Sequence, residues 1–211
     1  MTWTEFLAAH ADDLLWRSGE HVALCVATLA AACLIALPLG VWLTRLPRAA
    51  GTVLGLCSVI QTVPSLALLG FLMVLTGRIG WVPSVLALFL YALLPILRNT
   101  IVGLGTTPPP VRQAAIALGM TADQVLWQVS LPLAMPVVVA GLRTAAVWTI
   151  GTATLCAFIG AGGLGVFINR GIETVDARMV LLGVVPAAAL ALAVDALFAW
   201  SGRRLTPLGG T

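Results

Sequence analysis

The chain has 211 residues, of which 60% are hydrophobic and 9% are charged, and its mean hydropathy is +1.06. A soluble domain of this length cannot bury so much apolar surface, so the composition predicts a polytopic membrane protein. The net charge of +3 gives no reason to expect a nucleic-acid partner, because the arginines are scattered at the ends of apolar runs. All eleven cations are arginines. Without a lysine the chain can form neither a P-loop nor a Schiff base, so any ATP-driven role requires a separate ATPase.

The first twenty residues predict a short helix that lies at the membrane surface. Apolar side chains recur there at helical spacing, beginning with Trp3, Phe6 and Leu7. The stretch carries four acids and a single arginine, which is the reverse of a secretory signal peptide. Neither histidine has a partner motif, and the four cysteines lie inside apolar runs. We therefore expect no metal site and no disulfide.

Five apolar stretches are long enough, at about 20 residues each, to cross the hydrocarbon core. They predict spans over residues 21–43, 51–75, 81–104, 136–158 and 179–200. With five spans, the first and third connections share one side with the C-terminus, and seven of the eleven arginines fall on that side. The positive-inside rule places it in the cytoplasm of a bacterial or archaeal cell. We therefore expect the N-terminal helix 1–20 in the periplasm and the tail 206–211 in the cytoplasm.

Every predicted span contains a proline, which removes a helical hydrogen bond and frees a carbonyl that lipid cannot satisfy. A single such break is equally explained as a packing kink, but five together favour a moving, cavity-lining bundle. In the second span, Gln61, Thr62, Pro64 and Ser65 form a polar cluster near the bilayer midplane. The cluster predicts part of a pathway for a polar solute, with interhelical hydrogen bonding as the alternative. Asn99 on the third span is a further pathway candidate, with snorkelling to the nearby cytoplasmic surface as the alternative.

Two other features of the spans have competing interpretations. Asp195 is an intramembrane carboxylate, which is either functional or part of an ion pair near the cytoplasmic side. The glycine-rich run at 160–165 matches a dinucleotide-binding pattern, but it follows a span rather than a strand and lacks the expected acid about twenty residues on. We reject that interpretation. We expect Gly160, Gly162 and Gly163 to form a flexible hinge at the outer end of the fourth span.

The connection between the third and fourth spans, residues 106–132, is unusually long and polar. Three prolines stop the third span, and small and apolar residues then recur at helical spacing until Gly119 ends a short helix. A capping box at 121–124 begins a second short helix, which Pro132 is expected to end. The pattern predicts two helices that meet at a glycine elbow. A docking element for another protein is the favoured interpretation, and a cover for the protein's own helix ends is the alternative.

This connection resembles the EAA loop of the permease subunits of ABC importers. The residues at the loop's spacing are Gln113, Ala114, Ala115, Gly119, Val129, Leu131 and Pro132. The family's glutamate is replaced by Gln113, which keeps a hydrogen-bonding side chain and loses the charge, and its isoleucine is replaced by Val129. The resemblance implies that Gln113, Ala114, Ala115, Gly119, Leu131 and Pro132 contact a partner ATPase.

The segments 60–69, 91–100 and 157–165 resemble the osmoprotectant branch of these permeases, which imports glycine betaine, choline or carnitine. The resemblance implies an all-α, five-span type I importer fold with a methionine-permease-like core. It also implies a second permease copy or paralogue, an ABC ATPase that holds ATP and Mg²⁺, a periplasmic or lipid-anchored substrate-binding protein, and no cofactor or catalytic residue in this chain. Tyr91 is the only tyrosine and the tryptophans are spread along the chain. No aromatic cage is evident, which favours selection by the binding protein.

Three alternatives remain open. A permease for another small solute, such as methionine, would use the same scaffold. An intramembrane protease would need a G-x-S-G or H-E-x-x-H motif, and neither is present. A passive channel or assembly scaffold would have no evident use for the independently capped loop.

Overall fold

The computed structural model describes residues 2–205, apart from the side chains of residues 203 and 205, so the expected tail 206–211 lies outside it. Every regular element in residues 2–205 is helical. The helices are α1 (Trp3–Leu43), α2 (Pro47–Thr62), α3 (Ser65–Thr76), α4 (Trp81–Gly105), α5 (Pro109–Ala117), α6 (Ala122–Gln124), α7 (Leu131–Ala153), α8 (Gly165–Glu173) and α9 (Ala177–Leu205). Four of the described helical segments are long and apolar enough to cross a membrane, or five when α2 and α3 count as one broken span.

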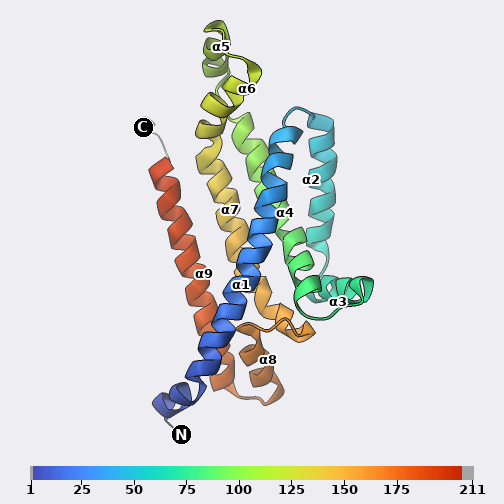
Figure 1. Cartoon of the computed structure of the whole chain (residues 1–211), viewed down its shortest axis with the longest axis vertical. Coiled ribbons are helices and arrows are strands. Elements are labelled where there is room, and N and C mark those ends of the chain that lie inside the picture. The colour runs from blue at the N-terminus through green and yellow to red at the C-terminus, as the bar shows by residue number, and fades with distance from the viewer. Residues whose placement is uncertain (1, 206–211) are drawn as a thin grey trace.

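Helices α1, α4, α7 and α9 run along the long axis of the molecule and pack side by side (Figure 1). Helix α4 lies at the centre, in contact with α1, α2, α3 and α7. At one end, α5 and α6 project beyond the bundle, and at the other the N-terminus and α8 lie together. The long axis therefore separates a projecting elbow at one end from the N-terminal region at the opposite end.

Helix α1 is continuous over 41 residues, so the expected separate helix 1–20 is instead the first half of a longer one. Thr2 begins it with a capping box, in which its hydroxyl accepts from the Glu5 amide and its own amide donates to the Glu5 carboxylate. At about 1.5 Å per residue the helix is roughly 60 Å long, twice the hydrocarbon thickness. The helix runs through Gly19 without a break, whereas the start of the apolar run alone decided the predicted boundary at residue 21.

The second predicted span, residues 51–75, is not a straight helix. Helices α2 and α3 meet at an angle of 102°, and α3 lies across the bundle (Figure 1). Val63 and Pro64 are extended at the break, because a proline disfavours helical geometry in the residue before it. Pro64 was correctly read as a helix breaker, but the sequence did not predict so sharp a bend.

The remaining predicted spans correspond to α4, to α7 with the 3₁₀ segment Thr154–Ile159, and to α9. Helices α4 and α7 approach closely where Gly141 faces α4. A Cβ added there would lie 2.5 Å from the Cβ of Asn99 and 2.7 Å from the carbonyl oxygen of Pro95. Such contacts allow two backbones to pack without bulky side chains between them, as is usual for helices in membranes.

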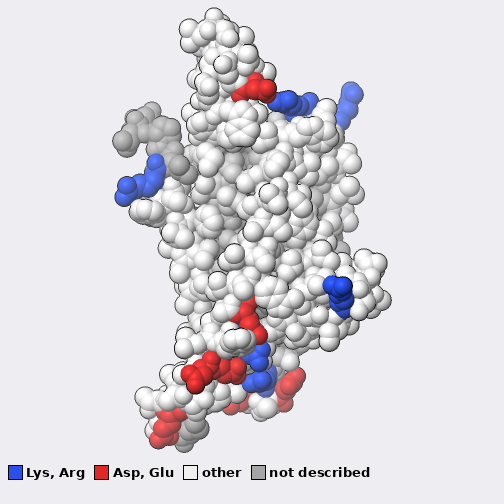
Figure 2. Space-filling view, in the orientation of Figure 1, with Lys and Arg blue, Asp and Glu red and all other residues white. Residues whose placement is uncertain are grey.

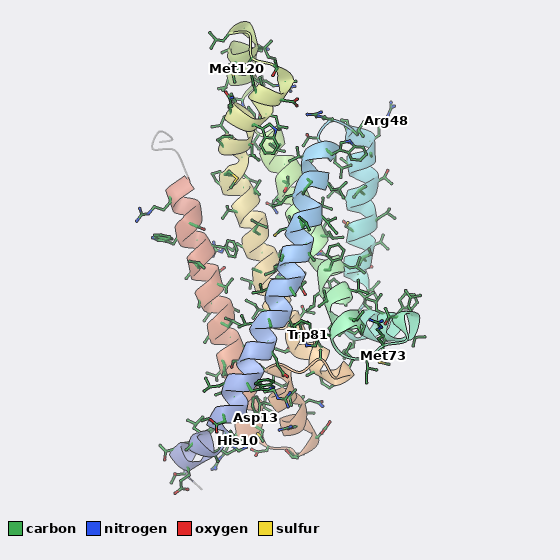
Figure 3. The ribbon with its side chains drawn as sticks, viewed as in Figure 1. His10, Asp13, Arg48, Met73, Trp81 and Met120 are labelled. Atoms are coloured by element: carbon green, nitrogen blue, oxygen red, sulfur yellow. The ribbon has the colours of Figure 1, made fainter. Side chains whose placement is uncertain are left out.

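Charged side chains gather at the two ends of the molecule on the face seen in Figure 2, with a broad uncharged band between them. Acidic groups concentrate at the end that holds the N-terminus, where His10 and Asp13 lie, whereas Arg48 and the elbow residue Met120 lie at the other end (Figure 3). This arrangement fits a bundle whose middle is in lipid and whose ends are in water.

Candidate coupling surface and translocation pathway

The elbow consists of helix α5, a glycine in the left-handed backbone conformation, and the start of helix α6. Helix α5 ends when Gly119 adopts a φ of +84°, and the amides of Gly119 and Met120 donate to the carbonyls of Ile116 and Ala115. Only glycine takes this backbone conformation without strain, which confirms it as the C-terminal stop of α5. Along α5 the side chain of Ala115 is buried and its neighbours are exposed, so nearly the whole helix is free to meet another surface.

Thr121 caps α6 as expected: its hydroxyl accepts from the amide of Gln124, and the Gln124 side chain accepts from the amide of Thr121. Asp123 in the first turn forms an ion pair with Arg45 across 3.0 Å. Both partners are largely exposed, so this pair orients α6 against the end of α1 rather than adding much stability.

Pro132 does not end the second helix of the loop, contrary to the prediction. Helix α6 continues through a π-helical turn, Val125–Ser130, directly into α7. In this turn the amide of Leu131 donates to the carbonyl of Leu126, five residues back. The wider turn shifts the hydrogen-bond register just before Pro132, whose ring and missing N–H would disturb a regular α-helix. Proline is tolerated at this point because it lies in the first turn of α7.

A cavity of about 590 Å³ separates the elbow from the rest of the bundle. It is bounded by the end of α1, the start of α2, the end of α4 and the first residues of α6, with Arg45 and Arg112 among its lining side chains. The elbow is therefore attached at its base and by one ion pair, and is not packed down onto the helix ends.

The pathway candidates on the second span gather at the break between α2 and α3. Gln61 donates through Nε2 to the carbonyl of Tyr91 on α4 at 3.0 Å, and the Tyr91 hydroxyl donates to the carbonyl of Val63 at 2.7 Å. Thr62 and Pro64 are exposed, and Ser65 begins α3. The Gln61 side chain thus makes the interhelical hydrogen bond considered as an alternative, and the exposed residues beside it stay pathway candidates.

Asn99 is not part of this group. It lies two turns further along α4 and donates to the carbonyl of Pro95 at 2.8 Å, against Gly141 of α7. Its side chain fills a helix contact, and its role in a pathway stays a prediction.

The glycine run that follows the 3₁₀ segment after α7 is a tight turn held from several sides. Gly160, Gly162 and Gly163 all have φ values near +80°. The amide of Gly163 donates to Glu20 of α1 at 2.9 Å, and the carbonyl of Ile159 accepts from the amide of Gly80 at 2.7 Å. The run is side-chain-poor as expected, but it is tied to α1 and to the α3–α4 turn. Its action as a hinge stays a prediction.

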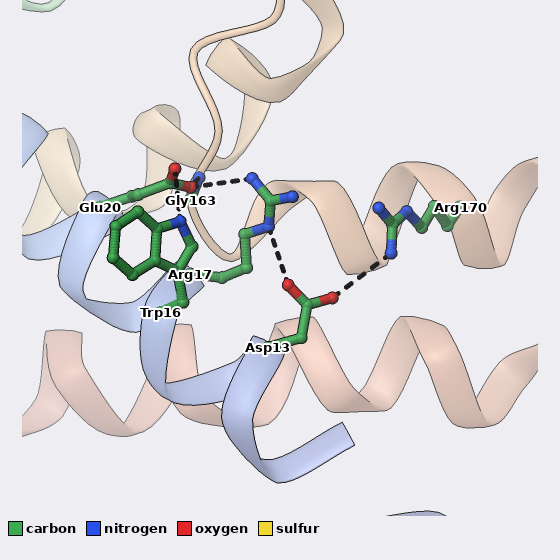
Figure 4. Close-up of polar contacts among 6 residues, drawn as sticks. All are labelled: Asp13, Trp16, Arg17, Glu20, Gly163 and Arg170. Carbon is green, nitrogen blue, oxygen red and sulfur yellow. Dashed lines mark hydrogen bonds and ion pairs between the residues drawn. The ribbon is translucent and has the colours of Figure 1, made fainter. Parts of the chain in front are cut away.

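Figure 4 shows charged side chains at the same end of the molecule, which add to the contacts between the glycine turn and α1. Arg17 contacts both Asp13 and Glu20 of its own helix, and Trp16 donates to Glu20. Arg170 of α8 reaches Asp13 at 3.4 Å. One continuous network therefore joins the first half of α1 to α8 and to the glycine turn.

Asp195 belongs to an ion pair, one of the two interpretations from the sequence. Arg143 of α7 holds it with two hydrogen bonds of 2.5 and 2.6 Å, and the two side chains join α7 to α9. The two residues are 52 positions apart in the sequence, so no local pattern identifies Arg143 as the partner of Asp195.

These features define a class: a multi-pass helical membrane protein with the fold of an ABC importer permease. A chain of the solved structure "Inward facing conformations of the MetNI methionine ABC transporter" superposes with a TM-score of 0.78, covering 92% of this chain and 96% of the other. At 24% sequence identity this similarity shows the fold alone. Residues 36–207 match the model of the family described as binding-protein-dependent transport system inner membrane component, and the chain belongs to that family. It is an inner-membrane permease component and not itself a catalytic subunit.

Three relatives are similar over nearly their whole length. The choline transport system permease protein OpuBB of Bacillus subtilis (strain 168) is 42% identical, with 97% of this chain and 94% of that protein covered. The glycine betaine/carnitine/choline transport system permease protein OpuCB of the same organism is 40% identical over the same shares. The osmoprotectant import permease protein OsmW of Salmonella typhimurium (strain LT2) is 41% identical, with 99% of each chain covered.

The fold brings together two aromatic residues that the sequence gives no reason to pair. Tyr91 and Trp148 line the same small hollow between α4 and α7, although 57 residues separate them in the chain. Tyr91 and the tryptophans are spread out along the chain, but Tyr91 and Trp148 are neighbours in the fold. Only the helix packing brings the two side chains to one place, so no local motif could have found them.

Proposed function

We propose that this chain is the membrane-spanning permease of an ATP-driven importer for osmoprotectants such as glycine betaine, choline or carnitine. Identity of 40–42% over at least 97% of the chain to three permeases, two named for these solutes and one for osmoprotectants, is the observation that carries the proposal. The EAA-like elbow supports a partner ATPase, and the absence of lysine from the chain makes that partner necessary for ATP hydrolysis. A second permease copy or paralogue and a substrate-binding protein complete the proposed assembly.

The elbow is the proposed contact with the ATPase. Gln113 and Ala114 are exposed on a short helix that projects from the bundle, and Gly119 sets the direction of the next helix. Leu131 and Pro132 start α7, so they connect the contact to the bundle rather than forming its tip. Gln113 offers an uncharged side chain to the partner, so the contact relies on shape and hydrogen bonding at this point.

The elbow end is the proposed cytoplasmic side. Arg45, Arg48 and Arg112 lie at this end, whereas the acidic network of α1 and α8 lies at the other. The positive-inside rule supports the same orientation, with the N-terminus outside and α9 ending inside. Single-cysteine variants at Leu118 and Val175, both highly exposed and at opposite ends, test it. An impermeant maleimide applied to intact spheroplasts should label position 175 and not position 118, and the reverse pattern would invert the topology.

Substrate is tested with the permease reconstituted together with its ATPase and binding protein in proteoliposomes. We expect ATP-dependent uptake of radiolabelled glycine betaine, choline or carnitine, and none when the ATPase or ATP is omitted. Uptake of methionine alone would replace the osmoprotectant assignment with the alternative solute. Uptake without ATP would instead indicate a passive channel.

A further inference from the structure

A shallow hollow on the bundle surface lies between α4 and α7. It is lined by Leu88, Tyr91, Ala92, Ala145, Trp148, Thr149 and Thr152, none of which is charged. Tyr91 lies ten residues from the outer end of α4, and Trp148 lies eleven residues before the 3₁₀ segment of α7 ends at Ile159. Along their own helices both residues are thus about 15 Å from the nearer end of α4 or of the α7 segment, which is close to the middle of a span of about 30 Å.

The position of Trp148 is unusual for a tryptophan that contacts only lipid. Its side chain is 58% exposed, although tryptophans in membrane proteins concentrate at the two interfaces, where the indole N–H finds water or headgroups. Trp42 and Trp200 follow that rule, since they lie near the ends of α1 and α9. An exposed indole at mid-depth, beside two threonines and a tyrosine, fits a surface that faces a solute pathway.

We propose that Trp148 and Tyr91 form a contact site for the quaternary ammonium group of the solute as it crosses the membrane. This inference rests on the proposed function, because it concerns the substrate of that importer. A cation without N–H donors cannot be held by hydrogen bonds, and in an uncharged surround the ring faces of tryptophan and tyrosine are its attractive partners. The attraction is strongest for tryptophan and grows when water is excluded.

Tyr91 connects the hollow, which it lines, to the break in the second span, to which it is hydrogen-bonded. Tyr91 is fixed from both sides: its hydroxyl donates to the carbonyl of Val63, and its own carbonyl accepts from Gln61. The exposed residues Thr62 and Pro64 lie next to this pair along the chain. The site therefore links the polar break of α2 and α3 to the exposed face of α7.

One chain provides only half of an enclosure. The volume of the hollow is about 10 Å³, which is room for about one water molecule and not for a trimethylammonium group. A surface that weakly attracts the cation, without closing around it, is what transport requires, because a solute held tightly would not leave. A facing surface of the second permease copy completes the pathway in the proposed assembly.

The test measures the maximal uptake rate in proteoliposomes with saturating, glycine betaine-loaded or choline-loaded binding protein. Trp148→Leu should lower the rate about tenfold, and Trp148→Phe should lower it about threefold or less, because phenylalanine keeps a ring face. The concentration of binding protein that gives half-maximal rate should stay unchanged, since capture occurs outside the membrane. Trp42→Leu is the matched control: this tryptophan is 56% exposed and lies outside the hollow, so its rate should stay within twofold of wild type.

A fluorination series at position 148 separates ring electrostatics from packing. Site-specific mono-, di- and trifluorotryptophan weakens the negative ring face stepwise with little change of shape, so the uptake rate should fall stepwise. Equal rates across the series, or a Trp148→Leu rate equal to that of Trp42→Leu, would overturn the contact site while leaving the importer in place. A wild-type assembly that takes up no quaternary ammonium solute would instead overturn the proposed function. Co-purification of the ATPase with each variant shows that it has folded.

Discussion

Gln61 on α2 donates a hydrogen bond to the backbone carbonyl of Tyr91 on α4, at 3.0 Å. In a regular helix this carbonyl would accept from the amide four residues on, but that residue is Pro95, which has no N–H. The Gln61 side chain therefore supplies the donor that the proline removes. Since lipid offers no substitute, the proline of α4 and the glutamine of α2 act as a matched pair across two helices.

This pairing makes a double-mutant test possible. Gln61→Leu should lower the free energy of unfolding by about 1 kcal/mol, which is typical of an interhelical hydrogen bond in a membrane protein. Pro95→Ala supplies a backbone N–H to the Tyr91 carbonyl, so Gln61→Leu should cost less in that background. The measurement is reversible unfolding of the purified permease in mixed micelles. Equal costs in the two backgrounds would show that the bond does not compensate for the proline.

Gly119 should be required for coupling to the ATPase rather than for folding of the bundle. A Cβ there would meet no atom within 4 Å, so the φ of +84° is the constraint that the backbone places on this position. Gly119→Asn, which tolerates the left-handed region, should keep most ATP-driven uptake, whereas Gly119→Val should abolish it. Uptake is compared with the yield of co-purified ATPase for each variant. Unimpaired uptake by Gly119→Val would remove the elbow from the proposed contact.

Gly162 and Gly77 separate backbone strain from crowding. Both have positive φ values, of +81° and +62°. A Cβ on Gly77 meets nothing, whereas one on Gly162 would collide with the carboxylate of Glu20. Gly77→Ala should cost about 1 kcal/mol of unfolding free energy from strain alone. Gly162→Ala should cost about 1–3 kcal/mol more from overpacking, measured by the same unfolding assay. Similar costs for the two variants would mean that the Glu20 carboxylate or the turn moves aside without penalty.

The pair of Arg143 and Asp195 predicts a simple order of melting temperatures. Arg143→Leu and Asp195→Leu each leave one charge without its partner between α7 and α9, and each should lower the melting temperature of the permease in detergent. The double variant removes both charges and should melt above either single variant. A double variant that melts below both would show that the pair contributes through packing of its long side chains rather than through charge.

The sequence correctly predicted a helical membrane protein and the elbow. It also correctly predicted where the first helix of the elbow ends and where the second begins, because each of these features depends on residues that are close in the chain. Gly119 and the Thr121 capping box are local stop and start signals, and the structure places both as expected. The sequence was wrong about Pro132, because a single π turn allows helix α6 to pass into α7, and no residue marks that turn in advance. The partners of Asp195 and Gln61 depend on how helices pack, so a single sequence could name the residues but not the pairs.

The unbroken helical run from Ala122 through Ile159 has a mechanical consequence. From Ala122 to Trp148 the run is about 39 Å long, and no loop interrupts it to absorb movement. We therefore expect a sideways displacement of Asp123 to tilt the whole helical segment. We expect a rotation of its end about the helix axis to rotate the indole of Trp148 about the same axis. Between Ala122 and Trp148 the π turn of Val125–Ser130 and Pro136 inside α7 both interrupt regular α-helical hydrogen bonding, so we expect the helix to bend at these two places first.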